Sequence, residues 1–183
     1  YWYVAVGRCD SQYGELFARV EQQLHAALEA HNAPLLTMLE RQRHFVQMLA
    51  TKNAELRVSR DTRPKKIEKL RALLADRKAG LRTLDPPLSL PLDPDVCIIG
   101  VAVENSTVFK SNLFPWRLEF RVDDDTSTYT VIVKNGDDLR QDQLVLQLFA
   151  LMDSLLRDEH LDVCITPYLS LIHISEPTRP LYI

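Results

Sequence analysis

Glycine and cysteine are both scarce in this chain, and their spacing excludes several kinds of site. Only five glycines occur among the 183 residues, and they nowhere have the spacing of a G-x-G-x-x-G loop or of a Walker A phosphate loop. The three cysteines lie far apart and form no C-x-x-C pair. They frame neither a disulfide scaffold nor a zinc site, so a reducing compartment is expected.

Long apolar runs and an excess of positive charge are also missing. No apolar run reaches the roughly 18–20 residues that a membrane-spanning helix needs. The net charge is −3, so the chain as a whole offers no basic field for nucleic acid. The first residues, Tyr1-Trp2-Tyr3-Val4, include neither an initiator methionine nor the basic residues of a signal peptide. This opening predicts that the sequence is a fragment of a longer protein.

Apolar residues at helical spacing run through the first third of the chain. They recur every three or four residues on both sides of Asn32-Ala33-Pro34, where the pattern breaks. A short break between two amphipathic segments predicts an antiparallel helical hairpin. A third helix is expected over residues 64–79, with Thr62 as its cap, Pro64 in its first turn and Gly80 just past its end.

That third helix lies in the most basic part of the chain. Residues 57–82 contain ten Lys or Arg and three Asp or Glu, a local net charge of +7. One interpretation is a surface for anionic lipid or for an acidic partner. A solvated helix face is the preferred interpretation, because the basic residues leave the apolar stripe of Ile67, Leu70 and Leu73-Leu74 free.

Beyond the basic helix, the pattern changes from helix to strand. Four prolines between Asp85 and Pro94 predict an extended connector, because proline fixes φ and donates no ladder hydrogen bond. Strands are expected at residues 96–99, 118–122 and 128–133.

Two further features complete this part of the chain. Asp123-Asp124-Asp125 predicts a solvated turn between the last two strands, since the spacing of a calcium-binding EF-hand is absent. A long amphipathic helix is expected over residues 139–157, where leucines recur at helical spacing.

The stretch that joins the last strand to that helix is the most informative about chemistry. Lys134 ends an apolar strand, Gly136 permits a sharp turn, and Asp138 and Asp142 follow at the start of the helix. Protein kinases orient an ammonium toward nucleotide phosphates by pairing a strand lysine with an acid on the following helix. A lysine at a strand end is far more often solvated, so the spacing alone leaves both interpretations open.

Three strings of residues resemble one enzyme family. K-N-G-D-D-L-R-Q-D-Q at 134–143 resembles the signature of the phosphatidylinositol 3-/4-kinases. P-L-S-L-P-L-D-P-D-V-C-I-I-G at 87–100 and V-F-K-S-N-L-F-P at 108–115 resemble the proline-rich segment and the phosphate-binding loop of class III phosphatidylinositol 3-kinase catalytic subunits. The resemblance spans residues 1–168 and is specific from Pro87 onward. It implies an α+β fold in which connector helices precede the N-lobe, an antiparallel sheet plus a helix, of a protein-kinase-like domain.

The resemblance also implies roles for particular residues. Ser111 would hydrogen-bond an ATP phosphate, and Lys134 would contact the α-phosphate. Four further residues would line the nucleotide pocket: Asp142 and Tyr168 in its inner part, and Ile132 and Phe109 on the adenine side. The pair Trp116-Arg117 departs from the smaller residues that often follow the loop proline in class III, which would alter the shape of the pocket.

Two motifs of the family are missing from the sequence. Neither the catalytic loop D-R-H-x-x-N nor the metal-binding D-F-G occurs. The resemblance therefore predicts that the chain holds no catalytic and no metal-binding residue and is inactive alone, because it lacks a base for the inositol hydroxyl and ligands for Mg²⁺.

For the parent protein, the resemblance implies a cytoplasmic lipid kinase that phosphorylates the 3-position of phosphatidylinositol, using ATP with Mg²⁺ or Mn²⁺. It would act peripherally on endosomal and autophagosomal membranes, with a pseudokinase-like regulatory subunit and Beclin-type subunits as partners and no nucleic acid. A phosphatidylinositol 4-kinase, which shares the K-x-G-D-D-L-R-Q core, is one alternative, although the F-K-S loop and the P-L-x-L-x-P connector favour class III. A non-catalytic helical interaction module is another.

The resemblance divides the chain into four parts. Residues 1–10 would end a helical domain, 11–85 would form the helical connector with the basic helix, and 86–168 would form the kinase N-lobe. Residues 169–179 are identical to a translation of the transposon-end adapter used in sequencing libraries. We therefore expect residues 169–183 to be an artefact of sequence assembly.

Overall fold

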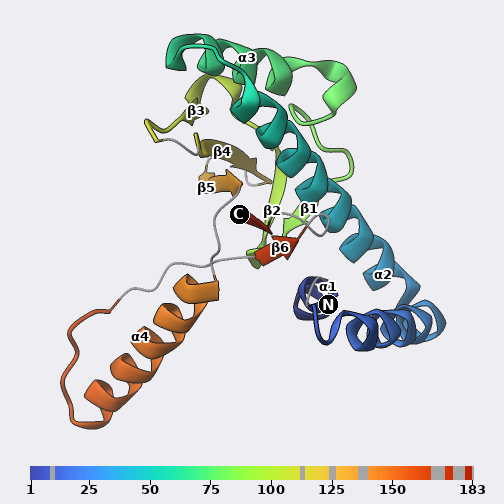
Figure 1. Ribbon diagram of the computed structural model, residues 1–183, viewed down its shortest axis with the longest axis vertical. Helices are drawn as coiled ribbons and strands as arrows, with labels where there is room; N and C mark the ends of the chain where they lie inside the picture. The colour runs from blue at the N-terminus through green and yellow to red at the C-terminus, as the bar shows by residue number, and fades with distance from the viewer. Residues whose placement is uncertain are drawn as a thin grey trace.

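The computed structural model combines helices with an antiparallel sheet, as the resemblance implied (Figure 1). The structure describes residues 1–8, 11–111, 114–123, 127–135, 140–165, 172–174 and 180–182. Among these residues, no helix is long and apolar enough to cross a membrane.

The chain begins with the short helix α1 (Trp2–Gly7) and the long helix α2 (Gly14–Val58), which is sharply kinked at Asn32. Asn32 has φ −156° and ψ 65°, and its Oδ1 accepts a hydrogen bond from the Leu35 amide at 3.2 Å. It thus caps the second arm of α2, and Pro34 falls in the first turn of that arm, where a missing N–H costs little. The predicted break at residues 32–34 is confirmed, as a kink rather than a loop.

A buried carboxylate joins the two arms of α2. Glu21 is 7% exposed, and its two oxygens accept hydrogen bonds from Arg8 Nη1 and Arg43 Nη1, both at 2.7 Å. Arg43 lies on the second arm and Glu21 on the first, so the arms fold back toward each other as a hairpin, and Arg8 ties in the segment that follows α1. The predicted hairpin is therefore confirmed.

The basic helix α3 (Arg63–Ala75) is shorter than the expected 64–79. Asp76 leaves the helical conformation, and its side chain accepts a hydrogen bond from the Lys78 amide at 2.9 Å. The chain then continues as the 3₁₀ turn η1 (Arg77–Ala79) and stops at Gly80, whose φ of +66° favours glycine. The stop at Gly80 and the proline in the first turn are confirmed.

An antiparallel sheet follows the helices. Its strands run in the order β1-β2-β4-β5, and β3 pairs with β4 beside β2. The short 3₁₀ turn η2 (Val103–Asn105) links β2 to β3. The bounds are β1 (Leu88–Leu90), β2 (Asp93–Val101), β3 (Thr107–Val108), β4 (Trp116–Val122) and β5 (Thr128–Asn135). All three expected strands are present.

The proline-rich segment is not the connector that the sequence predicted. Leu88 and Ser89 pair with Ile98 and Cys97, so β1 and β2 form a hairpin within the sheet. Leu88 and Leu90 are each 2% exposed and join the core. The prediction was wrong because the residues between the prolines keep their own N–H groups, and these are free to pair.

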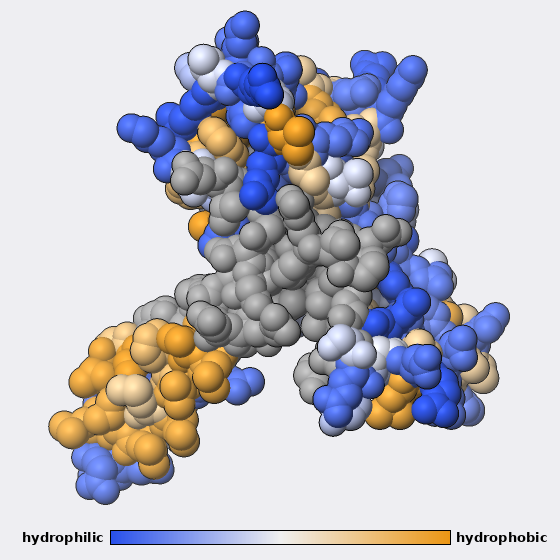
Figure 2. Space-filling model, in the orientation of Figure 1, coloured by the Kyte–Doolittle hydropathy of each residue, from blue (hydrophilic) through white to orange (hydrophobic). Residues whose placement is uncertain are grey.

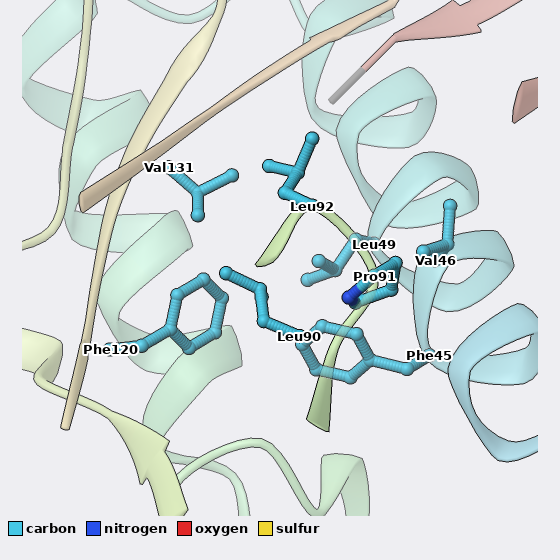
Figure 3. Close-up of a pocket in the computed structure, with 8 residues that line it drawn as sticks. All are labelled: Phe45, Val46, Leu49, Leu90, Pro91, Leu92, Phe120 and Val131. Atoms are coloured by element: carbon cyan, nitrogen blue, oxygen red, sulfur yellow. The ribbon is translucent and has the colours of Figure 1, made fainter. Parts of the chain in front are cut away.

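Helices cover one face of the sheet. The second arm of α2 packs on β1 and β5, and α3 packs on β3 and η2 (Figure 1). Figure 3 shows how tightly side chains from α2, β1, β4 and β5 meet there. The space that remains among them is about 10 Å³, at most enough for one water molecule and far below the volume of a ligand pocket. The residues around it are Phe45, Val46, Leu49, Leu90, Pro91, Leu92, Phe120 and Val131.

The last long helix, α4 (Arg140–Asp158), matches the expected 139–157 and extends away from the sheet (Figure 1). Its side chains from Leu144 onward leave a broad apolar surface exposed, which is the orange area over α4 in Figure 2.

Two short strands near the C-terminus extend the sheet. Strands β6 (Ile172–Ile174) and β7 (Pro180–Tyr182) pair with each other, and β7 pairs with the end of β5 at Lys134 and Asn135. The expectation that residues 169–183 are an artefact stays a prediction. Asp124 and Asp125 of the predicted turn, and Asp138 at the expected start of the last helix, lie outside the described residues.

Candidate functional site

The two faces of the β4–β5 pair differ completely in character. On the face toward the helices, Trp116, Leu118 and Phe120 of β4 are 0% exposed, and Val131 and Val133 of β5 are at most 3% exposed. Side chains alternate along a strand, so the residues between them lie on the opposite face. This open face carries Arg117, Glu119, Thr130, Ile132 and Lys134.

Strand register places the predicted phosphate loop beside Lys134. Trp116 pairs with Val108 on one side and with Val133 on the other. Val108, Trp116 and Val133 thus form one row across the three strands. Strands β3 and β5 both run antiparallel to β4, so Phe109 and Lys134 each lie one residue beyond that row. Neighbouring strands are about 4.8 Å apart, which puts the two backbones about 10 Å from each other on either side of β4.

The open face near this row has an apolar part. Ile132 is 50% exposed between two buried neighbours, and Phe109 is 38% exposed beside the buried Val108. The Phe109 amide donates to Pro115 O at 2.9 Å, which closes the base of the loop. The register therefore brings three of the six predicted residues, Phe109, Ile132 and Lys134, to one end of one face.

The loop itself turns back at Ser111. The Ser111 amide donates to Phe109 O at 3.1 Å, and the Phe114 amide donates to Ser111 O at 3.1 Å. Ser111 is exposed, and so is its neighbour Lys110. Ser111 thus lies at an exposed turn beyond the end of β3, and its role toward a phosphate stays a prediction.

Arg117 is a residue of this face that sequence reasoning did not assign to the site. Its guanidinium contacts Glu119 and Thr130 side chains at 3.4 Å each and donates to Asn105 O at 3.2 Å. It pairs across the sheet with Ile132. Alternation with the apolar residues of β4 was the signal that could have identified it.

Trp116, in contrast, cannot shape the pocket in the way that the sequence departure suggested. Its side chain is 0% exposed on the core face. Of the pair Trp116-Arg117, only Arg117 borders the open face.

Helix α3 supports the loop from behind. Its basic residues Arg63, Lys65 and Lys69 are exposed, as expected of a solvated helix face, but Lys66 is an exception. Lys66 is only 2% exposed, and its Nζ donates to Arg57 O at 3.0 Å and lies 3.6 Å from the centroid of the Phe114 ring. Burial lowers the pKa of Lys66. The helix buries this lysine because the ammonium finds a carbonyl and an aromatic face there. Arg63 Nε also donates to Val108 O at 2.9 Å.

Two predicted residues lie outside what the structure describes. Asp142 belongs to α4, but its side chain is not described, and Tyr168 is not described at all. The predicted pairing of Lys134 with Asp142 therefore stays a prediction. Within the described part of the chain, no three His, Cys, Asp or Glu side chains gather in a way that could hold a metal ion.

Comparison with known proteins identifies the same enzyme family. The family described as phosphatidylinositol 3- and 4-kinase matches residues 128–175. The chain is 42% identical over 172 residues to the phosphatidylinositol 3-kinase pik3 of Schizosaccharomyces pombe, covering 92% of this chain and 21% of that protein. It is 39% identical over 175 residues to phosphatidylinositol 3-kinase VPS34 of Arabidopsis thaliana, covering 91% of this chain and 22% of that protein.

A yeast relative gives the same picture. The identity to phosphatidylinositol 3-kinase VPS34 of Saccharomyces cerevisiae is 36% over 168 residues, covering 92% of this chain and 18% of that protein. The chain thus spans about a fifth of the length of the curated relatives that it matches. Together with the exposed loop, the strand lysine and the antiparallel sheet, these matches support a segment of a phosphatidylinositol 3-kinase of the VPS34 type.

Proposed function

We propose that this chain is the nucleotide-binding segment of a lipid kinase that transfers phosphate from ATP to the 3-position of phosphatidylinositol. The observation that carries the proposal is the strand register. It puts Phe109 and Lys134 level with each other on the open face, on either side of the start of β4. The names of the relatives, all phosphatidylinositol 3-kinases, support the choice of substrate.

The described residues fit the nucleotide part of ATP. The exposed apolar surfaces of Ile132 and Phe109 suit the adenine, which has two flat apolar faces. The ammonium of Lys134, on the same face and strand as Ile132, suits a phosphate, and exposed Ser111 offers a hydroxyl. Asp142 and Tyr168 keep their proposed places in the inner part of the pocket.

The chemistry of transfer needs more than these residues provide. ATP would supply the phosphoryl group, and Mg²⁺ or Mn²⁺, held by residues outside this segment, would neutralise charge on the phosphates. Neither D-R-H-x-x-N nor D-F-G occurs in this sequence. We therefore propose that residues 86–168 form an N-lobe, that residues 1–10 and 11–85 belong to the helical regions before it, and that the chain alone does not phosphorylate lipid.

Two alternatives remain testable. A phosphatidylinositol 4-kinase is compatible with the family description, which covers both activities, but the relatives reported above are 3-kinases. A non-catalytic helical module would not bind nucleotide. Nucleotide binding by the chain separates the kinase interpretations from the module, and the product of the parent enzyme separates 3- from 4-phosphorylation.

The cellular setting is also part of the proposal. By resemblance, the parent protein would be cytoplasmic and act at endosomal and autophagosomal membranes, with phosphatidylinositol as its lipid. A pseudokinase-like regulatory subunit and Beclin-type subunits would be its partners. Imaging of the tagged parent protein together with endosomal markers tests this setting, and a diffuse distribution would contradict it.

The first experiment measures binding of a fluorescent ATP analogue to the 183-residue chain. We expect Lys134→Ala to weaken binding about tenfold or more, because a cation facing a phosphate is lost. Lys78→Ala is the matched control, since Lys78 is an exposed lysine on η1. Equal binding by both variants and the unmodified chain would refute the role of Lys134.

In the parent kinase, Lys134→Ala should lower the rate by about 10²–10³ without lowering the melting temperature to match. Asp142→Asn should cause a smaller loss, because the lysine would lose its orienting partner. The double variant should be far from additive, since both changes disable one unit. Additive losses would show that the two residues act separately.

A further inference from the structure

Basic side chains of α3 contact both sides of the loop that contains Ser111. Arg63 Nε donates to Val108 O, at the residue before the loop, at 2.9 Å. Arg71 Nη2 donates to Glu104 O at 2.7 Å, in η2. Lys66 reaches the far end of the loop, where its Nζ lies over the Phe114 ring. Helix α3 therefore touches the loop segment before and after its turn.

Lys66 is the buried member of this set. Its ammonium donates to Arg57 O at 3.0 Å and lies 3.6 Å from the centroid of the Phe114 ring, while the residue is 2% exposed. A cation over an aromatic face is attracted to it, and the attraction increases when water is excluded. The contact joins the end of α2, α3 and the loop at one point.

Phe114 transmits that contact to the turn. Its φ is +46°, a left-handed conformation that a bulky residue rarely adopts without support from its surroundings. Its amide donates to Ser111 O at 3.1 Å. A contact that holds the Phe114 ring in place therefore also holds this hydrogen bond to Ser111.

We propose that Lys66 is a positioning residue of the nucleotide site. Its ammonium holds the Phe114 ring and so fixes the loop conformation that presents Ser111 to phosphate. This inference rests on the proposed function, because the phosphate is the ligand that the held loop would meet. Lys66 itself is turned toward the core side and acts only through Phe114.

The charge of Lys66, rather than its bulk, should be what matters. Methionine has a similar length and fills the same space, but it neither donates to Arg57 O nor attracts the ring as a cation does. Arginine keeps the cation and the donor. Lys66→Met and Lys66→Arg therefore separate the charge from the packing.

The first measurement is hydrogen exchange at the Phe114 amide in the 183-residue chain. We expect Lys66→Met to speed this exchange about tenfold relative to the amides of β4 and β5, and Lys66→Arg to stay within about threefold of the unmodified chain. The melting temperature of Lys66→Met should not fall, since an apolar side chain is easily buried there. Unchanged exchange in Lys66→Met would overturn the proposal, as would a general acceleration throughout the sheet.

The second measurement is binding of the fluorescent ATP analogue. Lys66→Met should weaken it about fivefold to tenfold, and Lys66→Arg should restore it. Unchanged binding by Lys66→Met overturns the positioning role. If the unmodified chain binds no nucleotide, the proposed function fails, while the exchange measurement still decides whether Lys66 holds the loop.

A second variant tests the same proposal if Lys66→Met does not fold. Phe114→Leu removes the ring and leaves the lysine in place, so it should speed exchange at residue 114 and weaken nucleotide binding to the same degree. Normal exchange and binding in Phe114→Leu would overturn the proposal equally.

Discussion

The second arm of α2 and the helix α4 both have an apolar stripe, but the stripe is buried on α2 and exposed on α4. On α2, Phe45, Val46 and Leu49 are 0–4% exposed beneath β1 and β5. On α4, the apolar residues from Leu144 to Leu155 that remain at the surface are 41–59% exposed. An apolar stripe shows that a helix has a face to cover, but the stripe alone does not show what covers it. The free energy of burial is gained only where a partner surface is present.

The difference predicts unequal costs for the same substitution. Leu49→Ala should lower the free energy of unfolding by about 2–5 kcal/mol, because it opens a cavity in a packed core. Leu148→Ala should lower it by about 0.5 kcal/mol or less, because that side chain is 48% exposed. Urea denaturation of both variants, followed by tryptophan fluorescence, measures the two values. Similar costs would show that α4 is as well packed in solution as α2.

The exposed face of α4 should make the chain associate. Large exposed apolar patches promote self-association, so we expect species larger than the monomer at micromolar concentration. The double change Leu148→Glu and Leu155→Glu should raise the concentration at which the chain associates by about tenfold.

Gln147→Glu with Ser154→Glu is the control for this prediction, since it adds the same charge at exposed polar positions of α4. Sedimentation velocity measures how far each of the two double variants associates. A sharp, monomeric and cooperative transition of the unmodified chain would contradict the prediction, as would equal dissociation by the control.

The smallest expected effect concerns ion pairs in the two regions. Asp61, just beyond α2, pairs with Lys69 of α3, whereas Arg157 pairs with Asp153 within α4 itself. Hydrogen bonds from Lys69 and then from Ser59 lower the pKa of Asp61 below its ordinary 3.8. A lowered carboxyl pKa contributes stability above the ordinary value, and this contribution is lost as the pH falls through the lowered pKa.

Asp61→Asn should therefore reduce stability slightly at neutral pH and not at all at the lowest pH. The measurement is the urea midpoint of the variant and of the unmodified chain between pH 7 and pH 2.5. Lys69→Met should flatten the same part of the profile, because it removes the partner that lowers the pKa. A difference that is constant with pH would contradict this role of Asp61.

Local signals predicted most of the elements. Asn32 and Pro34 marked the kink, Gly80 marked the end of the basic segment, alternation marked β4, and β-branched residues marked β5. The proline-rich segment was predicted wrongly, because a proline excludes only its own N–H from a ladder and says nothing of Leu88 and its neighbours. Long-range pairing decided that β1 belongs to the sheet.

The candidate site divides in the same way. The sequence identified Phe109, Ser111, Ile132 and Lys134 by resemblance, and the strand register places Phe109 and Lys134 on the same row. It named Arg117 only as a departure from the family pattern, and it did not single out Lys66. Arg117 lies opposite Ile132 on the neighbouring strand, and Lys66 reaches Phe114 across 48 positions of the chain.

By itself, the sequence determined the resemblance to the family and most helices and strands, and it predicted the residues that would meet a nucleotide, because these inferences depend on local periodicity and on short strings of residues. Only the tertiary structure decided which apolar faces are covered, which side of the sheet is open and which lysine of the basic helix is buried. Those properties arise from contacts between segments far apart in the chain, and their free energies depend on the partner surface rather than on the residue alone.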